Sequence, residues 1–293
     1  MALDLNNFRG RITITDGACG TELAKRGLPA GAIPELWNLD NPAAVGDVAR
    51  AYVAAGSEVV LTNSFNANPF ALAGHELAGR LEEIAEKAAA IARAAVNSAA
   101  HVFGSIGSTG KVLMMGDVDE QQVYNGFAAA ARALERGGAE AIVLETMTEL
   151  AEVLLALRAV RENTALPVIA SLTFGSGPDG TATVMGVTPE QVVREAAPAG
   201  AAVFGANCGV GPEPYIRVVQ RYRAATDALI WVKPNAGLPQ LKNGRNVFPM
   251  DAEAFAAAVP ALVAAGANFV GGCCGTTPEH IAAVRRLVSS MKA

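Results

Sequence analysis

The sequence carries little charge and few aromatic residues. Only 17% of its 293 residues are charged, 5% are aromatic, and the formal net charge is −5. A nucleic-acid binder needs a basic excess to contact phosphates, so nucleic acid is not an expected partner. Hydrophobic residues make up 51% of the chain. This is ample material for a large core, and it excludes general disorder.

Long apolar runs and cysteine pairs are also scarce. No stretch of about 18 strongly apolar residues without charge occurs, so no membrane span is expected. The N-terminus, MALDLNNFRG, has neither the basic nor the apolar segment of an export signal. Four cysteines are too few to form a disulfide framework in a chain of this length. We therefore expect a cytoplasmic protein with reduced thiols and no membrane partner.

Short β-like runs and amphipathic helical patterns alternate along the chain. Three helical patterns begin at Asn41, Thr188 or Thr277, each followed by proline, which is typical of helix starts. Several others end at a glycine that leads into the next run, at Gly56, Gly138, Gly200 and Gly266. The β-like runs are 12–17, 59–65, 101–107, 141–146, 167–174, 202–208, 229–235 and 269–274.

Eight such repeats, with no linker or charge run between them, predict a single (β/α)8 TIM barrel over residues 1–293. A doubly wound open sheet is the structural alternative. The barrel is favoured because nearly every run ends in small or polar residues, and in a TIM barrel these strand ends build the active site. The endings are Asp16-Gly17, Asn63-Ser64, Glu145-Thr146, Asn207-Cys208, Asn235 and Cys273-Cys274.

Three cysteines end two of these runs. Cys208 ends the sixth run, and Cys273 and Cys274 end the eighth. In a barrel these sulfurs face one mouth, and three thiolates with an open fourth position are typical of catalytic zinc. Burial for packing alone and a vicinal disulfide are the alternatives. Cys19 is interpreted as a packing residue near the mouth.

Several polar segments, taken in their order along the chain, resemble those of the homocysteine S-methyltransferase family. The resemblance extends over essentially the whole chain. Within the family the segments are closer to the homocysteine-binding module of cobalamin-dependent methionine synthases than to betaine–homocysteine methyltransferases. The resemblance implies a TIM barrel with L-homocysteine as substrate and one zinc ion held by Cys208, Cys273 and Cys274. The segments are Asp16-Gly17-Ala18 with Gly20-Thr21, 62–66 (TNSFN), Glu145-Thr146, Asn207-Cys208, 234–239 (PNAGLP) and 271–278 (GGCCGTTP).

The resemblance also implies the roles of further residues. Asp16 and Glu145 belong to the amino-acid pocket, and Asn235 lies near the metal. Coordination to zinc deprotonates a thiol, so homocysteine is expected to bind as the thiolate. Glu145 can bind its ammonium group, and backbone N–H groups of the turn with Gly17 and Ala18 can hold its carboxylate.

The methyl donor is predicted from two residues on the donor side. Asn66 and Thr146 stand where betaine enzymes carry tyrosines, so the aromatic cage for a quaternary ammonium is missing. We expect a methylcorrinoid carried by a separate corrinoid protein, because the chain ends soon after its eighth run and lacks the Asp-x-His-x-x-Gly motif. Betaine or S-methylmethionine is the alternative donor.

Two functions outside this class stay open at the level of the sequence. Lys233, near the end of the seventh run, is a candidate nucleophile for a Schiff-base lyase or aldolase. The cysteines alone would also suit a non-catalytic zinc-binding or redox-sensing module. Gly175, Gly177 and Gly180 match GxGxxG literally, but a turn and a β-like stretch follow them, so no dinucleotide site is expected.

Overall fold

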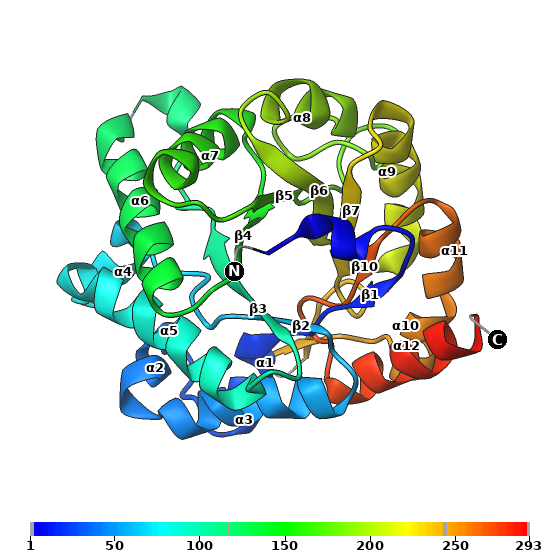
Figure 1. The fold of residues 1–293 in the computed structure, drawn as a ribbon, viewed down its shortest axis with the longest axis horizontal. Coiled ribbons are helices and arrows are strands. Elements are labelled where there is room, and N and C mark those ends of the chain that lie inside the picture. Colours follow the sequence, from blue (N-terminus) through cyan, green and yellow to red (C-terminus); the bar gives the residue numbers. More distant parts are fainter. Residues whose placement is uncertain (1–2, 117, 243–244, 292–293) are drawn as a thin grey trace.

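The computed structural model describes residues 3–116, 118–242 and 245–291, and its centre is a ring of eight parallel strands (Figure 1). The sheet order is β1-β10-β7-β6-β5-β4-β3-β2, and a parallel bridge between Thr15 and Val59 joins its two ends. The predicted TIM barrel is therefore confirmed. The strands are β1 Thr13–Ile14, β2 Val59–Leu61, β3 His101–Gly107, β4 Ala141–Met147, β5 Val168–Leu172, β6 Ala201–Cys208, β7 Leu229–Pro234 and β10 Phe269–Val270.

Helices surround this ring and return the chain from the end of one strand to the start of the next. The α-helices are α1 Cys19–Lys25, α2 Trp37–Asp40, α3 Pro42–Ala54, α4 Pro69–Ala73, α5 Leu81–Val96, α6 Glu120–Arg136, α7 Leu150–Asn163, α8 Pro189–Ala196, α9 Pro212–Ala225, α10 Ala252–Ala257, α11 Val259–Ala264 and α12 Pro278–Ser290. Short 3-10 helices are η1 Leu5–Phe8, η2 Pro34–Leu36, η3 Ala78–Arg80 and η4 Leu113–Met115.

The three predicted helix starts are confirmed by their caps. Asn41 accepts a hydrogen bond from the backbone of Ala44, and Thr188 forms a capping box at the start of α8. Thr277 forms the same arrangement at the start of α12. Each cap satisfies backbone N–H groups that have no partner inside the helix.

Three strands are each four residues shorter than their sequence runs. Strands β1, β2 and β10 stop before Asp16, Asn63 and Cys273, so these residues lie in the loops that follow rather than in the ladder. A hairpin of β8 Gln240–Lys242 and β9 Arg245–Val247 follows β7, and the sequence pattern did not predict it.

Aromatic side chains fill the barrel interior at the amino ends of the strands. The ring of Phe8, in η1, packs against Phe103 and Phe269 with centroid separations of 6.5 and 5.1 Å. Trp231 stacks on Phe103 at 6.1 Å. In Figure 1 the dark blue N-terminal segment lies across the barrel opening at this end. The segment therefore closes the amino end with apolar side chains.

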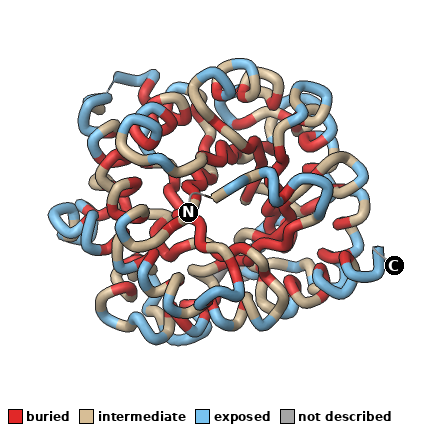
Figure 2. The backbone as a smooth tube through the Cα atoms, in the orientation of Figure 1, coloured by how far each residue is buried: buried red, intermediate tan, exposed pale blue. Residues whose placement is uncertain are grey.

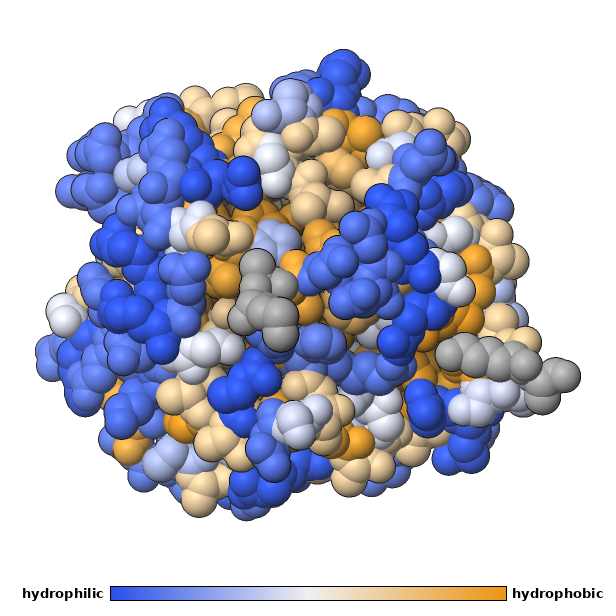
Figure 3. All heavy atoms as spheres, in the orientation of Figure 1, coloured by the Kyte–Doolittle hydropathy of each residue, from blue (hydrophilic) through white to orange (hydrophobic). Residues whose placement is uncertain are grey.

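A second apolar layer lies between the strands and the helices. It contains the side chains of β-strands that point outward and the inner faces of the helices. Figure 2 shows the buried backbone concentrated in the central ring, with exposed backbone on the outer helices. Hydrophilic residues dominate the helical rim in Figure 3, and apolar residues are seen closer to the centre. Within the described chain, no helix has the length and apolar character needed to cross a membrane.

Candidate active site

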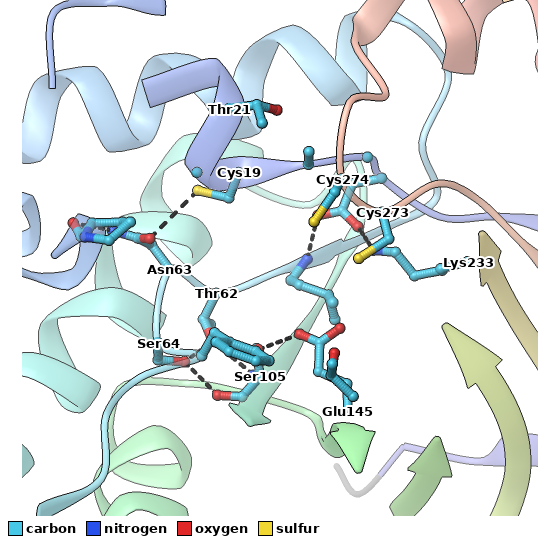
Figure 4. A pocket seen from close by; sticks show the side chains of 18 of the residues that line it. Cys19, Thr21, Thr62, Asn63, Ser64, Ser105, Glu145, Lys233, Cys273 and Cys274 are labelled. Carbon is cyan, nitrogen blue, oxygen red and sulfur yellow. Dashed lines mark hydrogen bonds and ion pairs between the residues drawn. The ribbon is translucent and has the colours of Figure 1, made fainter. Parts of the chain in front are cut away.

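A cavity of about 470 Å³ opens at the carboxyl ends of the strands, away from Phe8. Its walls come from the ends of most barrel strands, and Figure 4 shows many of the side chains that line it. The cavity therefore gathers residues that lie far apart in the sequence. The ionisable side chains on its walls are Asp16, Cys19, Glu35, Glu145, Cys208, Lys233, Cys273 and Cys274.

The structure brings Cys208, Cys273 and Cys274 together. Their three sulfur atoms lie within 4.8 Å of one another, and each side chain is partly buried. Among the described residues, this is the one group of three or more His, Cys, Asp or Glu side chains close enough to hold a metal ion together. Three sulfurs at this separation fit a soft divalent cation such as zinc, with one tetrahedral position left for another ligand.

The electrostatics of the three thiols are unequal. Hydrogen bonds from Cys273 and Cys274 are the largest influence on Cys208 and, helped by the amide of Asn235, lower its pKa to about 3. The pKa of Cys274 is correspondingly raised to about 12, first by its hydrogen bond to Cys208. The hydrogen bonds within the cluster thus stabilise negative charge on its sulfurs, and thiolate is the form that binds metal.

Glycines allow the chain before Cys273 to pass close to β1. A Cβ atom on Gly271 would lie 1.9 Å from Oγ1 of Thr15, and one on Gly272 would lie 2.4 Å from Oγ1 of Thr276. Any larger residue would push the paired cysteines away from Cys208. The glycines are therefore needed to bring the two ligand segments together.

Asp16 and Lys233 form a buried ion pair on the cavity wall. Oδ1 of Asp16 accepts a hydrogen bond from Nζ of Lys233, and Oδ2 accepts one from the backbone N–H of Leu61 at 2.7 Å. Both side chains are almost fully buried. An ammonium that is held by a carboxylate has no free lone pair for attack on a carbonyl, which argues against the Schiff-base role considered for Lys233.

Glu145, near the end of β4, is a buried carboxylate at the cavity. Oε1 accepts a hydrogen bond from the hydroxyl of Ser105 (Figure 4). Oε2 lies 3.4 Å from Nδ2 of Asn207. Burial raises the pKa of Glu145, while the positive charge of Lys233 and the Ser105 hydrogen bond act in the opposite direction. A cationic ligand group would stabilise the ionised carboxylate.

Asn207 organises the region between Glu145 and the cysteines. Its Nδ2 donates to Oγ1 of Thr146 at 2.7 Å, and its Oδ1 accepts from Ser171 at 2.7 Å and from the Thr146 N–H at 2.9 Å. Nδ2 also lies 4.0 Å from Sγ of Cys273. In the sequence, Asn207 is one of the polar strand ends and was given no role of its own, whereas in the structure its side chain is fully buried.

The chain leaves β4 and β6 in an unusual conformation. Thr146 and Cys208 have φ angles of 60° and 63°, in the left-handed region that non-glycine residues seldom occupy. At β6 this turn carries the backbone from the ladder to the cysteine cluster. Thr146 thereby reaches Asn207 with both its backbone and its hydroxyl.

On the donor side, Asn66 is held by a carboxylate that sequence reasoning missed. Glu35 accepts hydrogen bonds from the backbone N–H of Asn66 at 2.7 Å and from its Nδ2 at 3.3 Å. Burial raises the pKa of Glu35, and the Asn66 hydrogen bonds act against this rise. No motif or periodic pattern in the sequence pointed to Glu35, which lies in the short η2 segment.

The remaining predicted residues lie close to the cysteines or to α1. Gly17 and Ala18 line the cavity, and the N–H of Ala18 donates to Oγ1 of Thr276 at 3.2 Å. Asn235 donates to the carbonyl of Gly209 at 3.1 Å beside Cys208, outside the cavity lining. Cys19 lines the cavity, its thiol lies 3.5 Å from Oδ1 of Asn63, and burial strongly raises its pKa. Cys19 lies outside the cluster of three sulfurs.

Comparison with known sequences identifies a family and long relatives. The family model for homocysteine S-methyltransferase matches residues 13–288. Methionine synthases from Mycobacterium tuberculosis (strain ATCC 25618 / H37Rv) and Mycobacterium leprae (strain TN) are 31% and 28% identical, over 302 and 305 residues. These matches cover 96% and 97% of this chain and 25% of each relative. The chain thus spans about a quarter of the length of the curated relatives it matches.

Solved structures share the barrel. The oxidized form of the homocysteine methyltransferase MmuM from Escherichia coli has a TM-score of 0.79 and 25% identity, covering 96% of this chain and 97% of that one. The metallated form of MmuM has a TM-score of 0.78 and 24% identity, covering 95% and 96%. Dihydrodipicolinate synthase DapA-2 from Bacillus anthracis, with a TM-score of 0.55 and 12% identity over 96% of this chain and 75% of that one, is similar in fold alone.

Proposed function

The chain belongs to the homocysteine S-methyltransferase family, and from this premise we propose that it methylates L-homocysteine with one zinc ion held by Cys208, Cys273 and Cys274. As a family member the chain is a methyltransferase that acts on homocysteine. The observation that carries the zinc proposal is the group of three sulfurs within 4.8 Å of one another at the cavity. A soft, three-ligand set leaves one tetrahedral position for the substrate sulfur.

When bound, zinc supplies the Lewis acidity that keeps a thiol with a pKa near 8.5 as a thiolate at neutral pH. The chain's own residues prepare the surroundings of that sulfur. The amide of Asn235 stabilises the thiolate of Cys208, and Asn207 places a donor 4.0 Å from Sγ of Cys273. Such amide donors orient the ligands and stabilise their negative charge.

Glu145 is the proposed partner of the substrate ammonium. Its carboxylate is fixed by Ser105 and Asn207 and faces the same cavity as the sulfurs. A buried carboxylate in a rigid network binds a cation strongly, because few rotamers have to be ordered when the ligand arrives. Glu145 thereby fixes the amino acid so that its sulfur points along the line of methyl transfer.

For the methyl donor we propose a methylcorrinoid presented by a corrinoid protein. The support is the similarity to methionine synthases and the composition of the cavity wall, on which Phe65 is the one aromatic residue among the described lining. Asn66 and Thr146 supply polar groups where an aromatic cage for betaine would need rings. A cytoplasmic location is part of this proposal, because three free thiol ligands need a reducing compartment.

The test is a panel of donors with zinc-loaded protein and L-homocysteine. We expect methionine to form from methylcobalamin, at a higher rate when a corrinoid protein presents it. Betaine and S-methylmethionine serve as the alternative donors in parallel reactions. Efficient conversion of betaine to dimethylglycine, with no methionine from methylcobalamin, would overturn the corrinoid proposal in favour of the betaine alternative. Zinc-loaded protein that turned over none of these donors would instead support the non-catalytic module.

A further inference from the structure

Large hydrophobic side chains are exposed mainly at the carboxyl ends of the strands. Among the described residues, seven of the eight such side chains lie in the segments that follow β3, β5 and β7, and the eighth is Met291, beyond α12. Scattered exposed hydrophobic residues are ordinary, but residues gathered on one face indicate a surface that contacts a partner. The seven are Met114, Met115, Val184, Met185, Leu238, Leu241 and Val247.

Four of these residues, which we call the methionine rim, lie on the segments that follow β3 and β5. They are Met114, Met115, Val184 and Met185. The segment after β3 is fixed by Glu149, whose almost fully buried carboxylate accepts hydrogen bonds from the N–H groups of Leu113 and Met114 at 2.8 and 2.9 Å.

A second buried carboxylate holds the same segment. Glu152 accepts hydrogen bonds from the backbone N–H and the hydroxyl of Thr109 at 2.7 and 2.6 Å. Hydrogen bonds to an ionised acceptor are stronger than those between neutral groups. The methionines of η4 are therefore exposed on a firmly held segment, and loose packing is not the cause of their exposure.

The rim segment after β5 is attached to the same part of the chain. The buried hydroxyl of Thr183 donates to the carbonyl of Thr148 at 2.7 Å and accepts from the N–H of Met185 at 3.2 Å. Thr148 directly precedes Glu149, so one short stretch between β4 and α7 holds both segments. Thr146, two residues before Thr148, lines the cavity. The methionine rim is therefore held beside the cavity that contains the thiols.

The direction from which a methyl group arrives determines what lies over this rim. A methylcorrinoid holds its methyl group on cobalt, perpendicular to the plane of the corrin ring. In the transfer a sulfur–carbon bond forms and the cobalt–carbon bond breaks, cobalt keeping both electrons of that bond, so sulfur, carbon and cobalt lie in line. With the sulfur inside the cavity, the ring plane lies across the mouth and the ring edge lies over the surrounding segments.

We propose that the methionine rim is the surface on which the corrin ring of the methyl donor rests, with Glu149 and Glu152 as its positioning residues. The inference rests on the proposed function, because it concerns the donor to the same sulfur. The edge of a corrin ring carries methyl groups, and contact with the rim removes them from water. Methionine suits such an irregular edge, because its side chain is flexible and polarizable.

The test compares the kinetics and the binding of free corrinoids. Zinc-loaded protein with saturating L-homocysteine is supplied with increasing methylcobalamin, and hydroxocobalamin, which has the same ring without the methyl group, is titrated calorimetrically. We expect Met114→Gln/Met115→Gln to raise KM for methylcobalamin and to weaken hydroxocobalamin binding about 5- to 20-fold, because two apolar contacts become polar. The affinity for L-homocysteine and kcat at saturating methylcobalamin should change less than about 2-fold.

Three further variants separate this contact from stability. Val184→Ser/Met185→Gln changes the other rim segment and should give a loss of similar size. Glu149→Gln keeps the shape of a positioning residue but removes its charge, so it should raise KM for methylcobalamin in part and leave kcat unchanged. Met291→Gln changes an exposed methionine outside the rim, and as the matched control it should leave every constant at its wild-type value.

Each other outcome overturns the inference. If both double variants keep the wild-type KM and hydroxocobalamin affinity, the ring does not rest on the rim. If they lose activity only when a corrinoid protein presents the donor, the rim contacts the carrier protein and not the ring. If wild-type protein sediments as a dimer that both double variants dissociate, the rim joins two copies of this chain.

Failure of the proposed function gives a different result. Wild-type protein that binds L-homocysteine but takes no methyl group from methylcobalamin would overturn the corrinoid donor, and this inference with it. Zinc-loaded wild-type protein that does not bind L-homocysteine would overturn the proposed function itself.

Discussion

The two ends of the barrel are built from the same strands but differ sharply in chemistry. At the amino end, the interior is filled by the apolar rings of Phe8, Phe103, Trp231 and Phe269. At the carboxyl end, acids, amides, thiols and a lysine surround a cavity of about 470 Å³. A strand position therefore decides whether an inward side chain contributes to the core or to the site.

Along a strand, the change from an apolar interior side chain to a polar one occurs within two residues. Phe103 is followed by Ser105 on β3, and Trp231 by Lys233 on β7. Because alternate residues on a strand point the same way, each pair occupies successive interior layers. The core layer below thus supports each polar group directly, as the ring of Trp231 does for Lys233.

The largest effect is expected when a proposed metal ligand at the carboxyl end is replaced. Cys208→Ala should abolish zinc binding and bring methyl transfer below detection, because two sulfurs do not complete the site. The measurement is metal content by mass spectrometry together with methionine formation. Cys19→Ala is the matched control and should retain one zinc per chain. Full zinc in Cys208→Ala with loss of zinc in Cys19→Ala would show that the ligand assignment is wrong.

The second test breaks the amino end. Phe103→Ala should lower the free energy of unfolding by about 3–5 kcal/mol, since a large ring is removed from a packed interior. Denaturant unfolding measures this loss. The folded variant should still bind zinc, because the ligands lie at the other end. A large drop in zinc affinity without loss of stability would contradict the separation of the two ends.

A third test sharpens the carboxyl end by separating substrate from metal. Glu145→Gln should weaken L-homocysteine binding by about 2–4 kcal/mol, the cost of losing a partly buried charged hydrogen bond. Zinc content should stay at the wild-type level. Calorimetric titration provides the affinity, and an unchanged value would remove Glu145 from the substrate pocket.

The smallest effect is expected from a charge at the amino end. Burial alone would raise the pKa of Glu140, but hydrogen bonds from His101, the Val102 N–H and Arg93 outweigh it and lower the pKa to about 2. The ordinary value is 4.5, so this carboxylate stabilises the fold above about pH 4.5, and the contribution disappears as the pH falls toward 2.

Glu140→Gln should therefore reduce stability at pH 7 by about 1–2 kcal/mol after solvent screening is taken into account. The difference from wild type should shrink as the pH is lowered from 4.5 to 2. Unfolding curves across this range check the prediction. A difference that is constant with pH would mean that the carboxylate charge is not responsible.

Much of the fold was predictable from the sequence because its signals are local. Strand runs, proline-led helix starts and glycine-ended helices each depend on a few neighbouring residues, and Asn41, Thr188 and Thr277 cap their helices as predicted. The strand ends were less certain. Strand β10 stops at Val270, because the segment with Gly271 and Gly272 turns away to carry the cysteines.

The connections within the site were harder to predict because they join distant segments. Asp16 and Lys233 are 217 positions apart, and nothing in either neighbourhood shows that they form a pair. The sequence suggested Lys233 as a nucleophile, whereas in the structure its side-chain amine forms an ion pair with Asp16. For the same reason Glu35 was missed and Asn207 was given no role, since their importance lies in the groups they contact.

The left-handed backbone at Thr146 and Cys208 limits how this protein can be engineered for heat resistance. Each such residue costs on the order of 1 kcal/mol or more, and glycine would relieve this backbone strain. At Thr146 the gain is offset because glycine also removes the hydroxyl that Asn207 contacts, whereas at Cys208 the relief of strain raises the melting temperature. A screen scored on melting temperature alone would therefore select Cys208→Gly and discard a metal ligand. Variants designed for heat resistance should therefore keep Thr146 and Cys208 unchanged, even where a substitution there raises the melting temperature.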